Sequence, residues 1–182
     1  MIDELGYAKL TDFGLSKAIG EGRTFTLCGT PDYVAPEIIE NRGHNKAADY
    51  WALGVMLFEM IDGLPPFYIE GYEHQTFDRI LKGKLHFGHR FRNAEGRQAR
   101  DLIERLVCAD ISKRFGALKN GAVDIKSHPY FHGFDFDACW RKELRSGLKP
   151  DPHREHFDDY SSVAPVVAPP IKESAQVNFV DW

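Results

Sequence analysis

The sequence has few cysteines, no excess of basic residues and no long hydrophobic run, and each absence excludes a class of protein. Its 182 residues contain 23 Lys and Arg against 27 Asp and Glu, a formal charge of −4 at pH 7, so nucleic-acid binding through a globally basic surface is excluded. The three cysteines, Cys28, Cys108 and Cys139, are odd in number and widely spaced, which fits neither a disulfide framework nor a paired-cysteine zinc site. We therefore expect a reducing compartment, the cytoplasm or the nucleus.

Features of a membrane or secreted protein are also missing. The longest apolar stretch, residues 50–61, is interrupted by Gly54 and Glu59, whereas a membrane helix needs about 20 apolar residues. The first residues carry acids where a secretory signal carries basic side chains. With 43% hydrophobic and 13% aromatic residues, the chain can bury a core, and we expect one compact domain with an appendage.

One helix stands out in the hydrophobic pattern. Residues 46–62 leave almost no polar face, which is typical of a helix in the middle of a core. Gly63, followed by Pro65 and Pro66, is typical of the end of such a helix.

The rest of the pattern predicts a mainly α-helical chain with one strand. Residues 7–11 alternate between the two faces and lead to Asp12, which predicts a strand. Apolar residues recur with the helical period in three further segments, residues 73–82, 95–107 and 123–128.

Two regions lack helical periodicity. Residues 14–36 are rich in Gly, Thr and Pro, and a loop of this length is unusual in a compact domain unless it is functional. After about residue 132, clustered charges give way to a segment rich in Ser, Val and Pro, which predicts an extended tail. The expected division is therefore residues 1–131 and residues 132–182.

Short motifs occur in a fixed order along the chain. Asp12-Phe13-Gly14 follows the expected strand, and Ala35-Pro36-Glu37 begins 23 residues later. Each triplet alone is weak evidence, but together they frame a strand, a Thr-rich loop and a buried helix. The intervening segment, residues 24–34, resembles the AGC serine/threonine kinases, above all the cyclic-nucleotide-dependent ones. Further landmarks of the same family are matched by residues 49–54, 63–67, 113–116, 157–160 and 179–182.

This resemblance implies a mainly α fold, the carboxyl-terminal lobe of a partial protein-kinase fold with an AGC-type tail. It also implies transfer of the ATP γ-phosphate to Ser or Thr in protein substrates with nearby basic residues, and a regulatory domain or subunit that binds cyclic nucleotide. The cAMP- and cGMP-dependent branches both remain open, because residues 6–10 and 43–45 look more like the second and residues 45–47 and 157–160 more like the first.

The resemblance assigns a metal and nucleotide role to a few residues. Asp12 matches the aspartate that holds Mg²⁺ on the ATP phosphates, since phosphoryl transfer needs oxygen ligands for a divalent ion. Phe13 is then an aromatic of the core, and Gly14 permits an unusual backbone. ATP contacts are implied for Thr11, Phe157 and Tyr160.

A phosphorylation site is implied within the loop. Thr26 matches the activation-loop phosphoacceptor, and Lys17 matches a residue that contacts its phosphate, with Arg23 as another nearby cation. The alternatives are a solvated threonine at position 26 and Thr24 as the acceptor. Cys28 beside this site is a weaker candidate for a redox switch.

Other residues are implied to read the substrate. Leu27, Pro31 and Val34 match a pocket for the hydrophobic residue after the phosphoacceptor. Glu59, a charge on an otherwise apolar helix, is costly to bury unless a cation pairs with it, and it matches a glutamate that receives a substrate arginine. The alternative is a carboxylate at a helix end that reaches water.

A last group is implied to hold the loop in place. Thr30 matches the threonine that bonds to the catalytic loop. Glu37 and Arg114, 77 residues apart, match a buried ion pair. Asp49, at the start of the long helix, can accept backbone N–H groups there and matches a family carboxylate that accepts those of the catalytic loop.

The 182 residues contain none of the family's motifs that precede Asp12, namely the Gly-rich loop, the strand lysine and the H-R-D with its asparagine. We therefore expect no phosphoryl transfer by these residues alone. The long helix should then expose an apolar patch that favours aggregation. A second hypothesis is a non-catalytic product that binds substrates or a regulatory subunit, and a third is a helical module unrelated to kinases.

Overall fold

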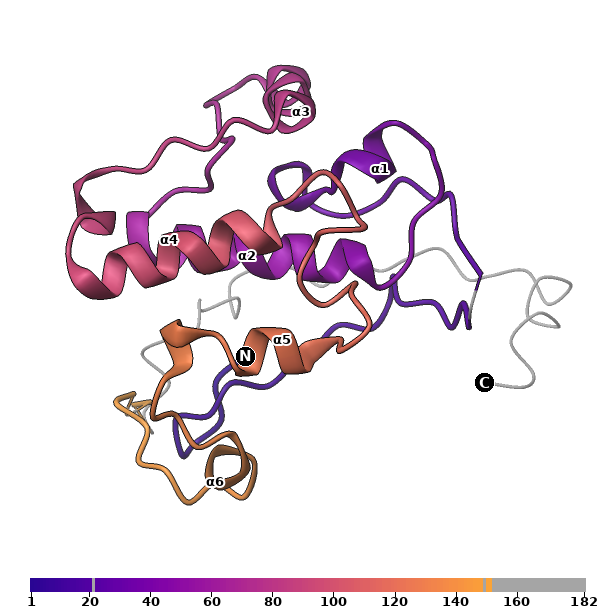
Figure 1. Ribbon diagram of the computed structural model, residues 1–182. Helices are drawn as coiled ribbons and strands as arrows, with labels where there is room; N and C mark the ends of the chain where they lie inside the picture. Colours follow the sequence, from indigo (N-terminus) through magenta and orange to yellow (C-terminus); the bar gives the residue numbers. More distant parts are fainter. Residues whose placement is uncertain (21, 149, 152–182) are drawn as a thin grey trace, which may run out of the picture. The chain divides into compact units, whose positions relative to one another are not determined.

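The computed structural model describes residues 1–20, 22–148 and 150–151. The chain divides into two units, one formed by residues 1–10 with residues from 145 onward and the other by residues 11–144, and each is considered separately. The second unit holds all the helical elements of the described residues (Figure 1), which are η1 Pro31–Tyr33, α1 Pro36–Ile39, α2 Ala47–Asp62, α3 Glu73–Lys82, η2 His89–Phe91, α4 Ala94–Leu106, α5 Ala122–Lys126, η3 Pro129–Phe131 and α6 Phe136–Trp140.

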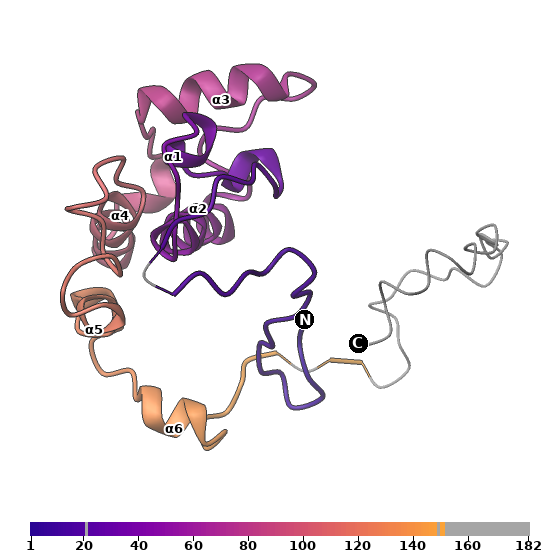
Figure 2. The same ribbon diagram turned by 90° about the vertical axis from the view of Figure 1, so that its right-hand side faces the viewer.

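Helices α2 and α4 form the centre of this unit. They lie side by side, and Figure 2 shows both nearly end-on, with α1 and α3 to one side of the pair and α5 and α6 to the other. A Cβ atom on Gly54 would come within 2.7 Å of the Leu106 and Val107 side chains, so glycine lets the two helices approach closely. The core between them includes the fully buried Trp51 and Ile103.

The ends of α2 have clear local causes. Gly63 adopts a left-handed conformation with φ of 99°, and its N–H donates to the Glu59 carbonyl at 2.8 Å, as the sequence leads one to expect of a glycine at a helix end. At the other end, the Asn45 side chain accepts the Ala47 N–H at 3.0 Å and its carbonyl accepts that of Ala48 at 3.0 Å.

Helix α2 is buried on one side only. Val55 and Phe58 are at most 2% exposed, whereas Leu53, Met56 and Met60 are 36%, 42% and 65% exposed. Burial on all sides, which the apolar pattern of residues 46–62 suggests, is therefore wrong, and the expected exposed apolar patch is present.

The other expected helices are observed with small shifts. Helix α3 has the expected bounds, and α4 begins one residue early because the Asn93 side chain accepts the Gly96 N–H at 2.7 Å. Helix α5 begins and ends slightly before the expected segment.

Helix α6 lies where the sequence pattern predicts an extended tail. The Asp135 carboxylate accepts the Ala138 N–H at 2.8 Å and so caps the helix. The Phe136 ring packs against Phe131 and Phe134, with centroids 5.1 and 4.8 Å apart. A local cap and an aromatic cluster are therefore enough to form a short helix in this segment.

The strand expected at residues 7–11 is not formed. A single antiparallel bridge joins Ile2 and Ala8, and the turn between them is closed by Asp3, whose carboxylate accepts the N–H groups of Leu5 and Tyr7 at 3.1 and 2.8 Å. One bridge without a further partner does not make a ladder, and no strand is assigned anywhere in the residues that the structure describes. In the same residues, no helix is both long and apolar enough to cross a bilayer.

Candidate functional site

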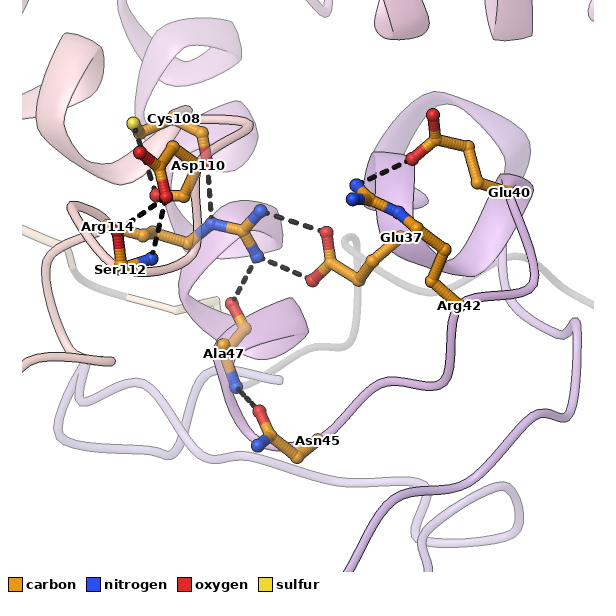
Figure 3. A network of polar contacts seen from close by, with 9 residues as sticks. All are labelled: Glu37, Glu40, Arg42, Asn45, Ala47, Cys108, Asp110, Ser112 and Arg114. Carbon is orange, nitrogen blue, oxygen red and sulfur yellow. Dashed lines mark hydrogen bonds and ion pairs between the residues drawn. The ribbon is translucent and has the colours of Figure 1, made fainter.

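Glu37 of α1 and Arg114 form a buried ion pair (Figure 3). The guanidinium nitrogens Nη1 and Nη2 donate to the two carboxylate oxygens at 2.7 and 2.9 Å, and the two side chains are 0% and 1% exposed. Arg114 also donates to the carbonyls of Ala47 and Cys108 at 2.9 and 2.8 Å. It therefore ties three segments together, the start of α1, the start of α2 and the chain after α4.

The same arginine packs on the core of α2. Its guanidinium lies over the Trp51 ring, 5.2 Å from the centroid, and Trp51 stacks on Phe67 at 5.9 Å with planes 8° apart. The charge of Arg114 is thus satisfied by one carboxylate, by carbonyls and by an aromatic face, which are the partners that a buried arginine needs.

Asp49 does not cap α2. It is exposed, and the Ala47 N–H at the start of the helix is instead accepted by the side chain of Asn45, two residues before the first helical residue. The sequence points to Asp49 through a family match whose partner lies in a loop, whereas the cap is local and could have been found from Asn45 alone.

Tyr33 and Glu59 are joined by a hydrogen bond in which the phenol donates to the carboxylate. Burial and this contact with Glu59 together raise the pKa of Tyr33 to about 12. The partner of the half-buried Glu59 carboxylate is therefore a tyrosine of η1 in the described residues. The role of Tyr33 was not predicted from the sequence. Its only indication there was its position within residues 24–34, the segment that resembles the kinase family.

The Asp12-Phe13-Gly14 triplet lies in exposed, irregular backbone. Asp12 has φ of 60°, a conformation that non-glycine residues seldom adopt, and its carboxylate accepts the Gly14 N–H at 3.3 Å. Phe13 is 64% exposed in the described part of the chain, and its place in the core stays a prediction for the whole kinase domain. The neighbouring loop forms no regular element that could cover the ring.

Only some of the residues implied for magnesium and the nucleotide lie in the part of the chain that the structure describes. No group of three His, Cys, Asp or Glu residues that could hold a metal ion occurs in the described residues. Asp12 and Thr11 are both exposed. The implied ATP contacts of Phe157 and Tyr160 fall outside the described residues, as do the tail aromatics Phe179 and Trp182.

The loop around Thr26 is held by its backbone. Thr24 and His44 exchange N–H···O=C bonds, both of 2.9 Å, and Thr26 is exposed. Lys17 does not point to Thr26 here, since its ammonium donates to the Thr24 hydroxyl at 3.3 Å. The expected cation therefore contacts the rival acceptor, Thr24.

The other cation and the cysteine of this loop also have defined places. Arg23 donates to the Arg42 carbonyl at 3.4 Å. Cys28 is a free thiol of intermediate exposure.

The residues expected to read the substrate differ in burial in the part of the chain that the structure describes. Val34 is 4% exposed and part of the core, while Leu27 is 60% exposed. An open pocket of about 490 Å³ includes Thr30 and Pro31 but neither of those two. It lies between the loop and the chain around α3, and its other lining residues are Asp32, Tyr68, Ile69, Gly71 and Thr76.

Comparison with known proteins identifies the family. Residues 1–131 match the family model "Protein kinase domain". The chain is 43% identical over 164 residues to cAMP-dependent protein kinase catalytic subunit 3 of Drosophila melanogaster, and 40% identical over 185 residues to the cAMP-dependent protein kinase catalytic subunit of Dictyostelium discoideum. These alignments cover 88% and 100% of this chain.

A relative from the other branch is similar to the same degree. Human cGMP-dependent protein kinase 2 is 41% identical over 169 residues, which cover 88% of this chain and 21% of that protein. The chain spans 27% of the length of each of the two cAMP-dependent relatives. Because the kinase-domain match extends over most of its residues, the chain belongs to the protein kinase family.

Proposed function

We propose that these residues are the carboxyl-terminal part of a serine/threonine protein kinase of the AGC type, whose whole protein transfers the ATP γ-phosphate to Ser or Thr. The observation that carries the proposal is the match of residues 1–131 to the protein kinase domain. The Glu37–Arg114 pair supports it, because it fixes the end of the Thr-rich loop to the helical core. The cyclic-nucleotide-dependent type is the finer assignment, supported by the names of the relatives.

The proposal places ATP and Mg²⁺ in the whole protein. Asp12 would be one oxygen ligand of the metal there, Thr30 a contact of the catalytic loop and Thr26 the phosphorylated residue. Since the Gly-rich loop, the strand lysine and the H-R-D motif are not among the 182 residues, we propose that residues 1–182 alone do not catalyse phosphoryl transfer.

Substrates with basic residues are proposed on the basis of Glu59. Its carboxylate accepts one hydrogen bond from Tyr33, and an ionised carboxylate has about four acceptor positions. It therefore keeps capacity for a guanidinium, whose paired N–H groups match a carboxylate.

Two further features belong to the proposal. The tail, residues 132–182, is assigned to the AGC type by sequence resemblance, and the boundary at residue 131 is where the family match ends. A cytoplasmic or nuclear location is supported by the three cysteines, all of which are free thiols.

The test compares two proteins from the same gene. Purified residues 1–182, incubated with ATP, Mg²⁺ and a basic serine peptide, should transfer no more phosphate than a heat-inactivated sample. A longer version that includes the upstream H-R-D motif should phosphorylate the peptide and lose this activity on Asp12→Ala. Transfer by residues 1–182 would contradict the proposed inactivity, and a fully active Asp12→Ala variant would remove Asp12 from the metal site.

A further inference from the structure

Basic residues are concentrated in one stretch of this acidic chain. Residues 79–100 contain seven Lys and Arg and one Glu, a net charge of +6. Since the whole chain carries −4, the remaining residues carry −10. Such a separation of charge is not required by the fold, because the seven cations are all exposed.

The stretch includes the connection between α3 and α4, which runs to the amino end of α4 (Figure 1). Exposure alternates along it, with Lys84 and His86 exposed and Leu85 and Phe87 packed against the core. This alternation is typical of extended backbone. Within the described ranges, the N–H groups of residues 84–88 donate to no other backbone carbonyl.

The arginines that follow are held in place by carbonyl groups. Arg90 donates to the Ile61 carbonyl at 2.8 Å, and Arg97 donates to the Arg92 carbonyl at 2.6 Å. A carbonyl orients a guanidinium without cancelling its charge. These side chains are therefore preordered, which reduces the entropy lost on binding an anion.

Arg100 joins the helix to the extended segment. Its guanidinium lies 4.7 Å from the centroid of the Phe87 ring and its Nε donates to Glu104 at 3.0 Å. We define the basic α3–α4 surface by its five cations, Lys84, Arg90, Arg92, Arg97 and Arg100.

Carboxylates are few around this surface. Glu95 is exposed in the first turn of α4, and Glu104 is paired with Arg100. Asp62 lies near the extended segment, since a Cβ atom on Gly88 would be 3.1 Å from its Oδ1. Asp101, which follows Arg100, is paired with Arg105 and His128. Residues 84–100 carry five cations and one Glu, a net charge of +4, and two exposed histidines, His86 and His89, so the surface is positive.

We propose that the basic α3–α4 surface binds an acidic peptide segment of a partner protein. Guanidinium groups match carboxylates and phosphates in geometry as well as in charge. The unpaired N–H groups of residues 84–88 can bond to the backbone of an extended peptide, as in strand addition to an open edge. The shared chemistry is a run of anionic side chains, whether Asp and Glu or phosphorylated Ser.

The charge of the rest of the chain favours a short peptide over a polyanion. Charges further apart than about 8 Å are largely screened at physiological salt, so a short peptide interacts mainly with the local positive surface. A nucleic acid or an anionic membrane extends beyond it and meets the acidic remainder of the chain. The inference does not depend on the proposed kinase activity. The substrates proposed for the kinase are basic, and this positive surface would repel them, so the surface would bind a different, acidic ligand.

The test measures binding of fluorescent probes to residues 1–182. The probes are an eight-residue glutamate-rich peptide, the same peptide with two phosphoserines, a lysine-rich peptide, a single-stranded oligonucleotide and phosphatidylserine vesicles. We expect both acidic peptides to bind in low salt, more weakly in 0.5 M salt, and the lysine-rich peptide not to bind. The glutamate and phosphoserine peptides distinguish the two sources of negative charge.

Matched variants locate the surface. The double variant Lys84→Glu/Arg92→Glu should weaken binding of the acidic peptides by about tenfold or more, since neither side chain has an ion-pair partner in the described residues. Lys119→Glu, a charge reversal at an exposed lysine outside the surface, should change it less than twofold. Circular dichroism and the urea midpoint establish that each variant is folded.

Three results would overturn the proposal. They are an absence of acidic-peptide binding in low salt, equal affinity in the double variant and in Lys119→Glu, and tighter binding of the oligonucleotide or the vesicles than of either acidic peptide. Equal loss in the two variants would mean that net charge, and not this surface, governs the interaction.

Discussion

Arg114 holds Glu37 through two parallel hydrogen bonds in a site from which solvent is excluded. The two residues are 77 positions apart, and the arginine also bonds the carbonyl at the start of α2. The pair therefore joins the end of the Thr-rich loop, through α1, to the central helix α2. Its loss should loosen the loop and the core together.

We expect Glu37→Gln and Arg114→Met each to lower the free energy of unfolding by about 3–5 kcal/mol, because each leaves a buried charge or its partners uncompensated. Urea unfolding followed by tryptophan fluorescence measures the change. Glu143→Gln is the control, since Glu143 pairs with Arg141 on the surface, and it should leave the midpoint unchanged. A cost for Glu37→Gln as small as that of the control would contradict the role of the buried pair.

The burial of Tyr33 and its hydrogen bond to Glu59 predict a loss of stability at high pH. The pKa of Tyr33 is raised to about 12 from its usual value near 10, so the folded chain keeps a proton that the unfolded chain releases. The stabilisation is complete below pH 10 and is lost as the pH rises from 10 to about 12.

The variant Tyr33→Phe should therefore show a shallower fall in the free energy of unfolding between pH 10 and 12 than the natural chain. Spectrophotometric titration of the phenolate should, in parallel, lose its highest-pH component. Tyr130→Phe, a tyrosine of η3, serves as the control. Identical slopes for Tyr33→Phe and the natural chain would show that neither burial nor Glu59 raises the pKa of the phenol.

Local patterns predicted the helices well, and long-range contacts less so. Helix α3 and the end of α2 at Gly63 follow from periodicity and a glycine cap, both of which act over a few residues. The strand at residues 7–11 was wrong because alternation cannot supply a partner strand. Helix α6 was missed because its cap and aromatic cluster occupy only a few positions in a polar segment.

In the candidate site, too, some contacts could be predicted from the sequence and others could not. The pairing of Glu37 with Arg114 could be reached through the family resemblance, since no rule of spacing joins residues 77 apart. The core position of Phe13 stays a prediction, because the described residues leave the ring exposed and its burial depends on segments of the whole domain. Tyr33 and Asn45 were not predicted, because the family motifs assign roles to neighbouring residues, Val34 in the first case and Asp49 in the second.

A second pH effect is expected at Asp101. The hydrogen bond from Arg105, and next that from His128, hold the pKa of Asp101 below its usual value. Oδ2 of Asp101 lies 2.8 Å from the Arg105 Nε and 2.7 Å from the Nε2 of the buried His128. The stabilisation from Asp101 is therefore present above its unfolded pKa, near 3.8, and is lost as the pH falls below that value.

Asp101→Asn should lower stability at pH 7 and flatten the acid limb of the stability curve below about pH 4. Urea midpoints measured from pH 3 to 7 test this. Asp137→Asn, on the exposed surface of α6, is the comparison. An acid limb as steep in Asp101→Asn as in the natural chain would exclude this carboxylate as its source.

The exposed side of α2 predicts self-association. Leu53, Met56 and Met60 lie on one side of the helix with 36% or more of each residue exposed, and contiguous apolar surface of this kind favours association. Sedimentation velocity should show residues 1–182 forming larger species as concentration rises. The double variant Met56→Lys/Met60→Lys should remain monomeric with an unchanged circular dichroism spectrum. Equal self-association of the variant and the natural chain would mean that another surface mediates the association.

The start of α2 offers a direct comparison between a family match and a local cap. Asn45 accepts the Ala47 N–H with its side chain, and removal of such a cap costs about 1 kcal/mol. Asp49 is exposed in the first turn, where a negative charge stabilises the helix through its dipole by about 0.3–1 kcal/mol at most and less in salt.

In 0.5 M salt, Asn45→Ala should therefore lower the free energy of unfolding by about 1 kcal/mol, and Asp49→Ala should leave it nearly unchanged. A larger cost for Asp49→Ala would mean that its carboxylate, and not Asn45, satisfies the first N–H groups of the helix.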